Sequence, residues 1–237
     1  MNEEKLDKIL ADHLKWLNNE DGGVRANLIG ADLRNTVLSS AKLSSADLRN
    51  TDLRNANLMG ANLSYASLTD ADLSNANLSS ADLSSTYLST ADLSYAKLSD
   101  TNLIGANLTD ANLSNADLRG ANLTDADLTD ANLSDADLSY VNLSYADLSY
   151  ADLTGADLSS ANLSYAIGNG IEIQTHQTKF YLVNITKDRM QIGCENHSIK
   201  GWFKFDNKRI LEMDGKKGLK FWKKWKPILK LMVKTKE

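Results

Sequence analysis

The sequence predicts an all-β solenoid, a quadrilateral β-helix of about seven coils, flanked by a capping helix and a small α+β region. Leu returns at every fifth position from Leu28 to Leu163, which gives 28 repeats. The residue two positions before each Leu is Ala in 23 of these repeats. With one Pro and only 7% aromatic residues, the chain lacks the varied side chains of a globular core along its whole length.

A period of five residues fits neither an α-helix nor a flat strand. Five residues turn about 500° on an α-helix, so successive Leu side chains would spiral over every face. On a flat strand, the odd spacing would send alternate Leu side chains to opposite faces. Every Leu points inward only if the chain makes a quarter turn per repeat. Coils of twenty residues spaced about 4.8 Å apart then form a rod roughly 34 Å long.

The residue types suit such a coil. Leu fills the axis, and the corner beside it admits only a side chain near Ala in size. Asp, Asn, Ser and Thr bond locally to the backbone and therefore favour the turns. The small position departs from Ala in five repeats, at Thr36, Thr51, Thr86, Thr101 and Val141.

The segments on either side of the repeat have other patterns, so we expect three parts: residues 1–25, 26–165 and 166–237. Residues 3–19 predict an amphipathic helix that ends before Gly22-Gly23. We expect it to lie over the first coil, with a partner-binding helix as the alternative. Its apolar stripe comprises Leu6, Ile9, Leu10, Leu14 and Leu17.

The repeat breaks after Ala166, and the last part changes from strand to helix patterns. Alternating β-branched residues predict two short strands within 171–185 and a third at 189–192. Residues 207–213 and 219–233 predict helices, the second with a kink at Pro227. The stretch from Lys216 to Lys236 is rich in lysine, with apolar residues at helical spacing. We expect this stripe to cover the last coil; a dimer contact through the same residues, Leu219, Trp222, Trp225, Leu229 and Met232, is the alternative.

The unit A-(D/N)-L-(S/T)-x resembles the pentapeptide-repeat family, and the resemblance covers about 60% of the chain. It implies a right-handed quadrilateral β-helix and a binding rather than a catalytic role. The segments Met190–His197 and Phe221–Trp225, Trp202, and His13 to Trp16 ahead of Gly22-Gly23 look like those of phage- and prophage-encoded bacterial members.

The net charge of −5 hides two parts of opposite sign: residues 26–165 carry −12 and residues 166–237 carry +9. Wrapping the chain at twenty residues per coil aligns acidic residues in two columns. The first acidic column contains Asp32, Asp52, Asp72 and Asp92, and the second contains Asp117, Asp137 and Asp157.

Two functions for the acidic columns stay open. Carboxylates at regular spacing could imitate the phosphates of a DNA duplex, and the resemblance implies a type II topoisomerase such as gyrase as the partner. The chain differs from such relatives in having only Leu, without Phe, at the core position and no loop inserted between coils. The alternative, which we favour, is a solvated turn-forming face that keeps the protein soluble.

Aromatic and basic residues offer further candidate surfaces. Four tyrosines occupy the last position of their repeats near the end of the rod; they either pack under the C-terminal part, which we favour, or form a partner or dimer surface. The basic tail could instead bind nucleic acid or an anionic membrane. The tyrosines are Tyr140, Tyr145, Tyr150 and Tyr165.

The sequence contains no nucleophile–base pair, phosphate-binding loop or complete metal-ligand set, so we expect no enzyme activity, cofactor or metal. Cys194 and His197 form only half of a zinc motif. One cysteine, no apolar leader and no long apolar run predict a cytoplasmic chain. The sequence therefore favours a scaffold for protein–protein interaction with an unidentified partner.

Overall fold

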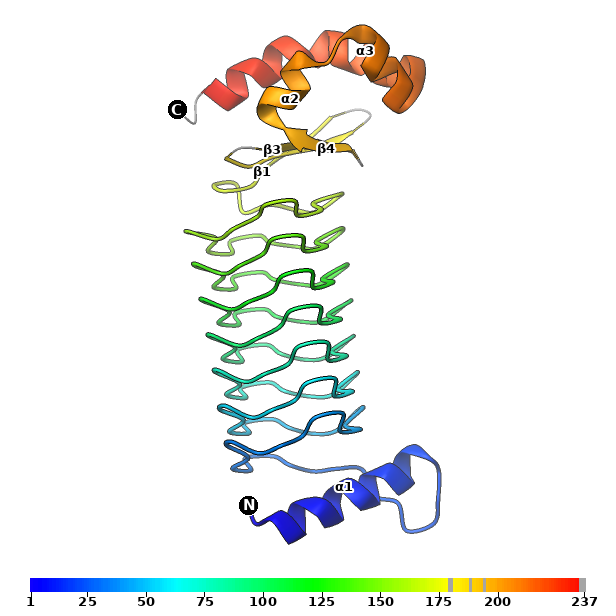
Figure 1. Ribbon diagram of the computed structural model, residues 1–237, viewed down its shortest axis with the longest axis vertical. Helices are drawn as coiled ribbons and strands as arrows, with labels where there is room; N and C mark the ends of the chain where they lie inside the picture. Colours follow the sequence, from blue (N-terminus) through cyan, green and yellow to red (C-terminus); the bar gives the residue numbers. More distant parts are fainter. Residues whose placement is uncertain (179–180, 188, 194, 235–237) are drawn as a thin grey trace.

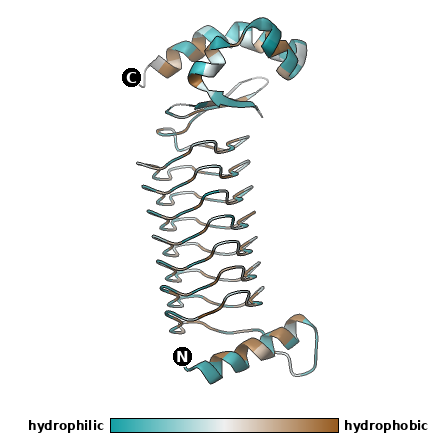
Figure 2. Ribbon diagram, in the orientation of Figure 1, coloured by the Kyte–Doolittle hydropathy of each residue, from teal (hydrophilic) through white to brown (hydrophobic). Residues whose placement is uncertain are grey.

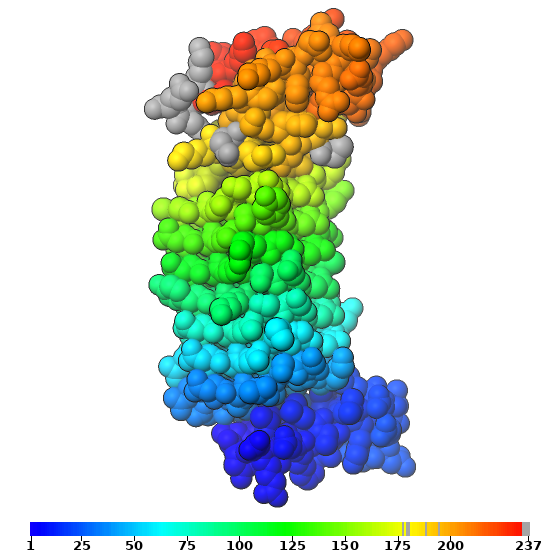
Figure 3. Space-filling view, viewed as in Figure 1, coloured from blue at the N-terminus to red at the C-terminus, as the bar shows by residue number. Residues whose placement is uncertain are grey.

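The computed structural model describes residues 1–178, 181–187, 189–193 and 195–234. A rod of stacked coils lies between the N-terminal helix α1 and a C-terminal layer of sheet and helices (Figure 1). The space-filling view shows a rod of even width, with α1 projecting beyond its side at one end (Figure 3). No helix in the described ranges is long and apolar enough to cross a membrane.

Helix α1 spans Glu3–Leu17, and the side chain of Asn2 caps it by accepting a hydrogen bond from the Lys5 N–H. Leu6 is buried, and Ile9 and Leu10 pack against the core of the rod. Leu14 was expected on the same stripe, but 47% of it is exposed; His13 is buried instead.

His13 fixes the junction between α1 and the rod. Its ring is fully buried, and Nδ1 accepts a hydrogen bond from the Ala26 N–H at 3.1 Å. The loop that returns the chain from α1 passes so near the helix that a Cβ on Gly23 would lie 2.4 Å from the Trp16 nitrogen. This close approach explains why glycine stands there. Burial lowers the pKa of His13, an effect that the Ser44 backbone carbonyl opposes and Arg25 reinforces.

We expect the N-terminal junction to weaken as the pH falls from 7.5 to 5.5. Because the pKa of His13 is lower in the folded protein, the unfolded chain binds more protons below about pH 6.5, so stability decreases as the pH drops through that value. The slope cannot exceed about 1.4 kcal/mol per pH unit for one proton. Urea unfolding of His13→Gln should show a flatter pH dependence than that of the wild type; equal slopes for the two proteins would contradict this account.

The rod is built from parallel bridges between residues twenty positions apart, from Asn27↔Asp47 to Asp147↔Ile167. In a typical rung, Leu28 N–H donates to the Asp47 carbonyl at 2.8 Å, and Asp47 N–H donates to the Ala26 carbonyl at 3.0 Å. A turn occurs every five residues, so each coil has four sides. The rod is thus a β-helix in which each side of a coil forms one bridge to the same side of the next coil.

Leu side chains fill the rod, and most are at most 3% exposed. Where Thr replaces Ala, its hydroxyl is bonded to a main-chain carbonyl. Thr51 Oγ1 donates to the Leu48 carbonyl at 2.6 Å, and Thr101 Oγ1 donates to the Leu78 carbonyl at 2.9 Å. Thr is therefore accommodated without leaving a polar group unsatisfied.

The fifth residue of every repeat, from Gly30 to Tyr165, has a left-handed backbone with φ between 54° and 75°. The following residue closes the turn; for example, Ala31 N–H donates to the Leu28 carbonyl. Gly, Asn and Asp tolerate this conformation best, whereas a bulky side chain is an outlier there. The turn therefore accounts for the small and polar residues at this position.

The C-terminal part forms an antiparallel sheet in the order β1-β2-β3-β4, with two helices. β4 and α2 were not expected from the sequence. The helices predicted at 207–213 and 219–233 are both present within α3, because the non-helical residues Asp214 and Gly215 separate them, and Pro227 lies inside the second. The elements are β1 (Gln174–Gln177), β2 (Leu182–Ile185), β3 (Arg189–Ile192), β4 (Glu195–Ser198), α2 (Ile199–Lys204) and α3 (Asn207–Lys234).

The apolar stripe of α3 packs on the sheet and α2, not on the last coil as the sequence suggested. Trp222 and Leu229 are buried, and Leu219, Trp225 and Met232 pack around them in a second core. This core also contains Val183, Ile185, Met190 and Ile192 of the sheet. Hydrophilic and hydrophobic residues alternate along α1 and α3, as expected for helices with one buried face (Figure 2).

Candidate interaction surfaces

The first acidic column lies along one side of the rod, since bridges join Asp32 to Asp52, Asp52 to Asp72, and Asp72 to Asp92. These carboxylates also close local turns; Asp72 Oδ1, for example, accepts the Ser74 N–H at 3.0 Å. Arg34 bridges two coils, with 2.7 Å to Asp32 and 3.4 Å to Asp52. Part of the negative charge in this column is therefore neutralised.

The second acidic column has the same construction near the other end, with bridges from Asp117 to Asp137 and from Asp137 to Asp157. Arg119 lies 2.7 Å from Asp117 and 3.5 Å from Asp137. The hydrogen bond from Arg119 lowers the pKa of Asp117, and the bond from the Ser159 hydroxyl lowers the pKa of Asp157. Both carboxylates are therefore ionised at neutral pH, and Asp157 has no cationic partner among the described residues.

The sequence favours packing of the four tyrosines under the C-terminal part. The structure contradicts this, because all four are exposed. Between 50% and 81% of each is exposed, and Tyr150 is the most exposed. Tyr145 and Tyr165, one coil apart, stack with ring centroids 4.9 Å apart. All four have left-handed φ values, from 59° to 62°. The fold gains little from bulky side chains at these positions.

The lysines of α3 are not all free in solvent. Lys226 Nζ lies 5.0 Å from the centre of the Trp222 ring, and Lys230 Nζ lies 5.7 Å from that of Phe203. Their stems and charges thus cover aromatic rings. Ile228 and Leu231 of the same helix are exposed, which leaves a mixed basic and apolar outer surface.

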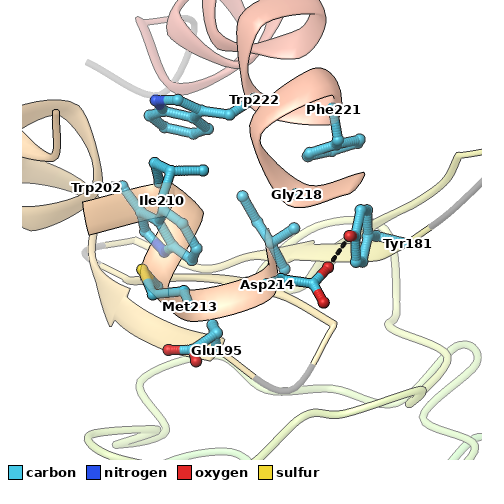
Figure 4. Close-up of a pocket in the computed structure, with 10 residues that line it drawn as sticks. Tyr181, Glu195, Trp202, Ile210, Met213, Asp214, Gly218, Phe221 and Trp222 are labelled. Atoms are coloured by element: carbon cyan, nitrogen blue, oxygen red, sulfur yellow. Dashed lines mark hydrogen bonds between the residues drawn. The ribbon is translucent and has the colours of Figure 1, made fainter. Parts of the chain in front are cut away.

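The C-terminal core contains a small cavity of about 30 Å³ between Ile192, Trp202, Phe221 and Trp222 (Figure 4). The Tyr181 hydroxyl donates a hydrogen bond to Asp214 at its side. A water needs roughly 10–15 Å³ of such space, whereas small-molecule sites occupy roughly 300–1,000 Å³. The cavity has room for water but not for a substrate.

Of the two residues of the half zinc motif, Cys194 lies outside the described residues. His197 packs against Trp202 and Phe205, and its Nε2 lies 3.0 Å from Glu195. Within the described ranges, no three His, Cys, Asp or Glu side chains gather as metal ligands. The contacts of His197 fit a role in packing.

One further surface was missed at the sequence level: a groove of about 740 Å³ between the last coil and the sheet, lined by Leu153, Ala156, Leu158, Ile171 and Lys187. The repeat pattern does not predict this groove. Ala156 and Leu158 have the same residue types as their buried counterparts in other coils, and only the position of the sheet leaves them uncovered.

A family profile described as pentapeptide repeats matches residues 24–55, 56–94, 96–135 and 136–167. Among solved structures, a pentapeptide repeat protein from the Arabidopsis thaliana thylakoid lumen is 36% identical, covering 44% of this chain and 69% of that chain, with a TM-score of 0.30.

Two further structures are similar over more of the chain. HetL, a pentapeptide repeat protein involved in heterocyst differentiation regulation from the cyanobacterium Nostoc, is 37% identical, covering 60% of this chain and 76% of that chain, with a TM-score of 0.26. QnrB1, a plasmid-mediated fluoroquinolone resistance protein, is 24% identical, covering 59% and 71%, with a TM-score of 0.33. No curated protein matches the sequence significantly.

Proposed function

The chain belongs to the pentapeptide-repeat family, whose fold is a right-handed β-helix, and on this premise we propose that it is a non-enzymatic scaffold that binds a protein partner. Its rod of about seven coils presents side chains at fixed spacing, and the partner binds near the C-terminal end. One observation carries this proposal: Tyr140, Tyr145, Tyr150 and Tyr165 are exposed on the last coils.

Three properties of the tyrosines support an interface. Their side chains lie outside the core, so the fold does not require them. They occupy positions with a left-handed backbone, which Gly, Asn and Asp adopt more readily, so they lower stability locally. Tyrosine is also enriched at protein interfaces because its ring is large, stiff and amphipathic. A local cost with little structural return beyond the stacking of Tyr145 on Tyr165 is typical of functional residues.

The proposal is tested by replacing all four tyrosines with Asn, which tolerates the left-handed turn. We expect the melting temperature to stay the same or rise, while partner capture from a bacterial lysate falls at least about tenfold, as expected for loss of interface hot spots. The matched control replaces Tyr65 and Tyr95, which are comparably exposed on earlier coils, with Asn. Capture of the same proteins by wild type and the quadruple variant would exclude these tyrosines as the interface.

A second candidate, a DNA mimic that binds a type II topoisomerase, has one observation in its favour. Asp117 and Asp157 are held ionised, one carboxylate per coil along the second acidic column. In that case Asp117→Asn, Asp137→Asn and Asp157→Asn together should abolish capture of a topoisomerase, and binding should weaken steeply with salt. If the basic tail were the functional part, the Asp changes would have little effect.

A further inference from the structure

The last coil, residues 146–165, has no further coil above it. The main-chain N–H and C=O groups that would bond to a next coil therefore need other partners. On one side the chain itself supplies them: Ala146 and Leu148 bond to the main chain of Ile167. Elsewhere the C-terminal part substitutes side-chain amides for the missing main chain. Asn169 Nδ2 donates to the Ala151 carbonyl at 3.0 Å.

The side formed by residues 161–165 is closed by the sheet. Gln191 Oε1 accepts the Leu163 N–H at 2.7 Å, Asn184 Nδ2 donates to the Leu163 carbonyl at 2.5 Å, and Asn196 Nδ2 donates to the Ala161 carbonyl at 2.6 Å. Asn184, Gln191 and Asn196 lie side by side on three adjacent strands. The sheet therefore presents a row of amides to the rod and its apolar face to the helices.

On the side formed by residues 151–155 the Leu153 N–H has no partner among the described residues, but on the side formed by residues 156–160 both groups lack one, and we call this side the open face. Neither the Ala156 carbonyl nor the Leu158 N–H has a hydrogen-bond partner among the described residues. One coil below, the equivalent groups of Ala136 and Leu138 bond to Asp157 N–H and to the Asp157 carbonyl. The open face thus offers one donor and one acceptor, spaced for the bridge that joins coils throughout the rod.

Side-chain burial identifies the same place. Ala136 and Leu138 are each 1% exposed, whereas Ala156 and Leu158 are only partly buried. They line the groove of about 740 Å³ beside Ile171, of which 73% is exposed. This volume lies within the range of ligand sites in proteins. The groove is lined by both apolar and charged side chains. Unpaired main-chain groups at the mouth of such a groove are the features that accept an added strand.

We propose that the open face binds one extended segment of a partner protein by strand addition, with a basic side chain of that segment above Asp157. This inference rests on the proposed function as a protein-binding scaffold and adds the place and mode of binding. One residue of the segment donates its N–H to the Ala156 carbonyl and accepts the Leu158 N–H, as position two of each repeat does within the rod.

The basic side chain follows from charge. Asp157 and Asp152 at this end have no ion pair among the described residues, and the hydrogen bond from Ser159 keeps Asp157 ionised. Within the rod, Lys97 stands one coil below Asp117 in the same column and helps to lower its pKa. A lysine of the bound segment, in register above Asp157, would make the same kind of contact, except that the lysine would lie above the aspartate instead of below it. The apolar floor of Leu158 and Ile171 suits an aliphatic residue beside it.

The test uses the full-length protein and a capped heptapeptide with the sequence of residues 40–46, which places one lysine, Lys42, at position two of a single repeat. Binding is followed by amide NMR. We expect the Leu158 N–H signal to move and its hydrogen exchange to slow, while Leu148 N–H, already bonded to Ile167, stays unchanged. The matched protein variants each remove one carboxylate. Asp157→Asn changes the open face, and Asp147→Asn changes the side that Ile167 already closes.

Two altered peptides separate the backbone from the charge. Methylation of the Lys42 backbone nitrogen removes the N–H and should weaken binding about tenfold. Replacing Lys42 by Glu, or Asp157 by Asn in the protein, should weaken it severalfold, while Asp147→Asn should not. The proposal is overturned if Leu158 does not respond to millimolar peptide or if N-methylation has no effect.

A second copy of the chain is the competing occupant. A Leu158 signal that moves with protein concentration alone, together with a dimer in sedimentation, would replace the partner segment by a second copy and overturn the proposal. The tyrosine experiment reads a different surface. Tyrosine-dependent capture with a silent peptide titration would leave the scaffold function in place and remove only strand addition.

Discussion

Replacing Leu93 by Asp is expected to abolish cooperative unfolding of the rod. Leu93 is 1% exposed and lies within a core made almost entirely of Leu and Ala. A carboxylate there would be buried without a cationic partner or water, at a cost of several kcal/mol, comparable with the whole stability of many domains. Adjacent coils depend on each other for their bridges, so the damage spreads along the rod. Thermal and urea denaturation followed by circular dichroism measure the effect.

The matched control is Tyr95→Asp, two residues further along the same repeat. Tyr95 is 59% exposed and has a φ of 58°, a conformation that Asp tolerates better than Tyr. The same carboxylate should therefore be neutral or slightly stabilising. Equal destabilisation by the two substitutions would show that Leu93 does not point inward.

The rod was predictable from the sequence because a single constraint acts on every repeat. A five-residue period with Leu always inside permits only a coil of quarter turns, and the bridges between residues twenty apart follow from it. The same regularity placed Asp117, Asp137 and Asp157 in one column. What periodicity does not reveal is which of their oxygens bond to turns; Ser139 N–H, for example, donates to Asp137 Oδ1.

The ends were less predictable, because their structure depends on contacts between distant segments. β4 consists of four polar residues without alternation, and it is a strand because it pairs with β3. His13 is buried because its ring meets the Ala26 N–H, a contact that the helical stripe does not encode. Likewise, the open face exists because the amides of the sheet reach Ala161 and Leu163 but not Ala156.

The tyrosines show how a candidate site can be named without its surroundings being known. Their position in the repeat was evident, but whether the C-terminal part covered them depended on where the sheet lies. The sheet contacts the rod through short amides above Leu163, and Tyr150 remains 81% exposed. Exposure, and with it the case for an interface, could be read only from the structure.

Removing residues 216–237 is expected to make the protein self-associate while most of the rod stays folded. The deletion takes away Phe221, Trp222 and Leu229, which are buried against the sheet and α2. Val183 and Trp202 would then face water, and a large exposed apolar patch promotes association. The Leu core of the rod is a separate cluster, so its melting transition should persist, while a second, local transition disappears. Size-exclusion chromatography and calorimetry measure the two effects.

Two point variants test whether the effect of the truncation comes from the buried packing of α3, because neither of them removes a charge. Trp222→Ala should destabilise the C-terminal core by about 3–5 kcal/mol, the usual cost of removing a large buried aromatic side chain. Leu231→Ala, at a residue that is 68% exposed on the same helix, should be silent. A truncated chain that stays monomeric, with an unchanged melting curve, would show that α3 does not protect the sheet. Loss of binding to anionic lipid or nucleic acid in such a well-folded chain would then favour the basic tail as the functional part.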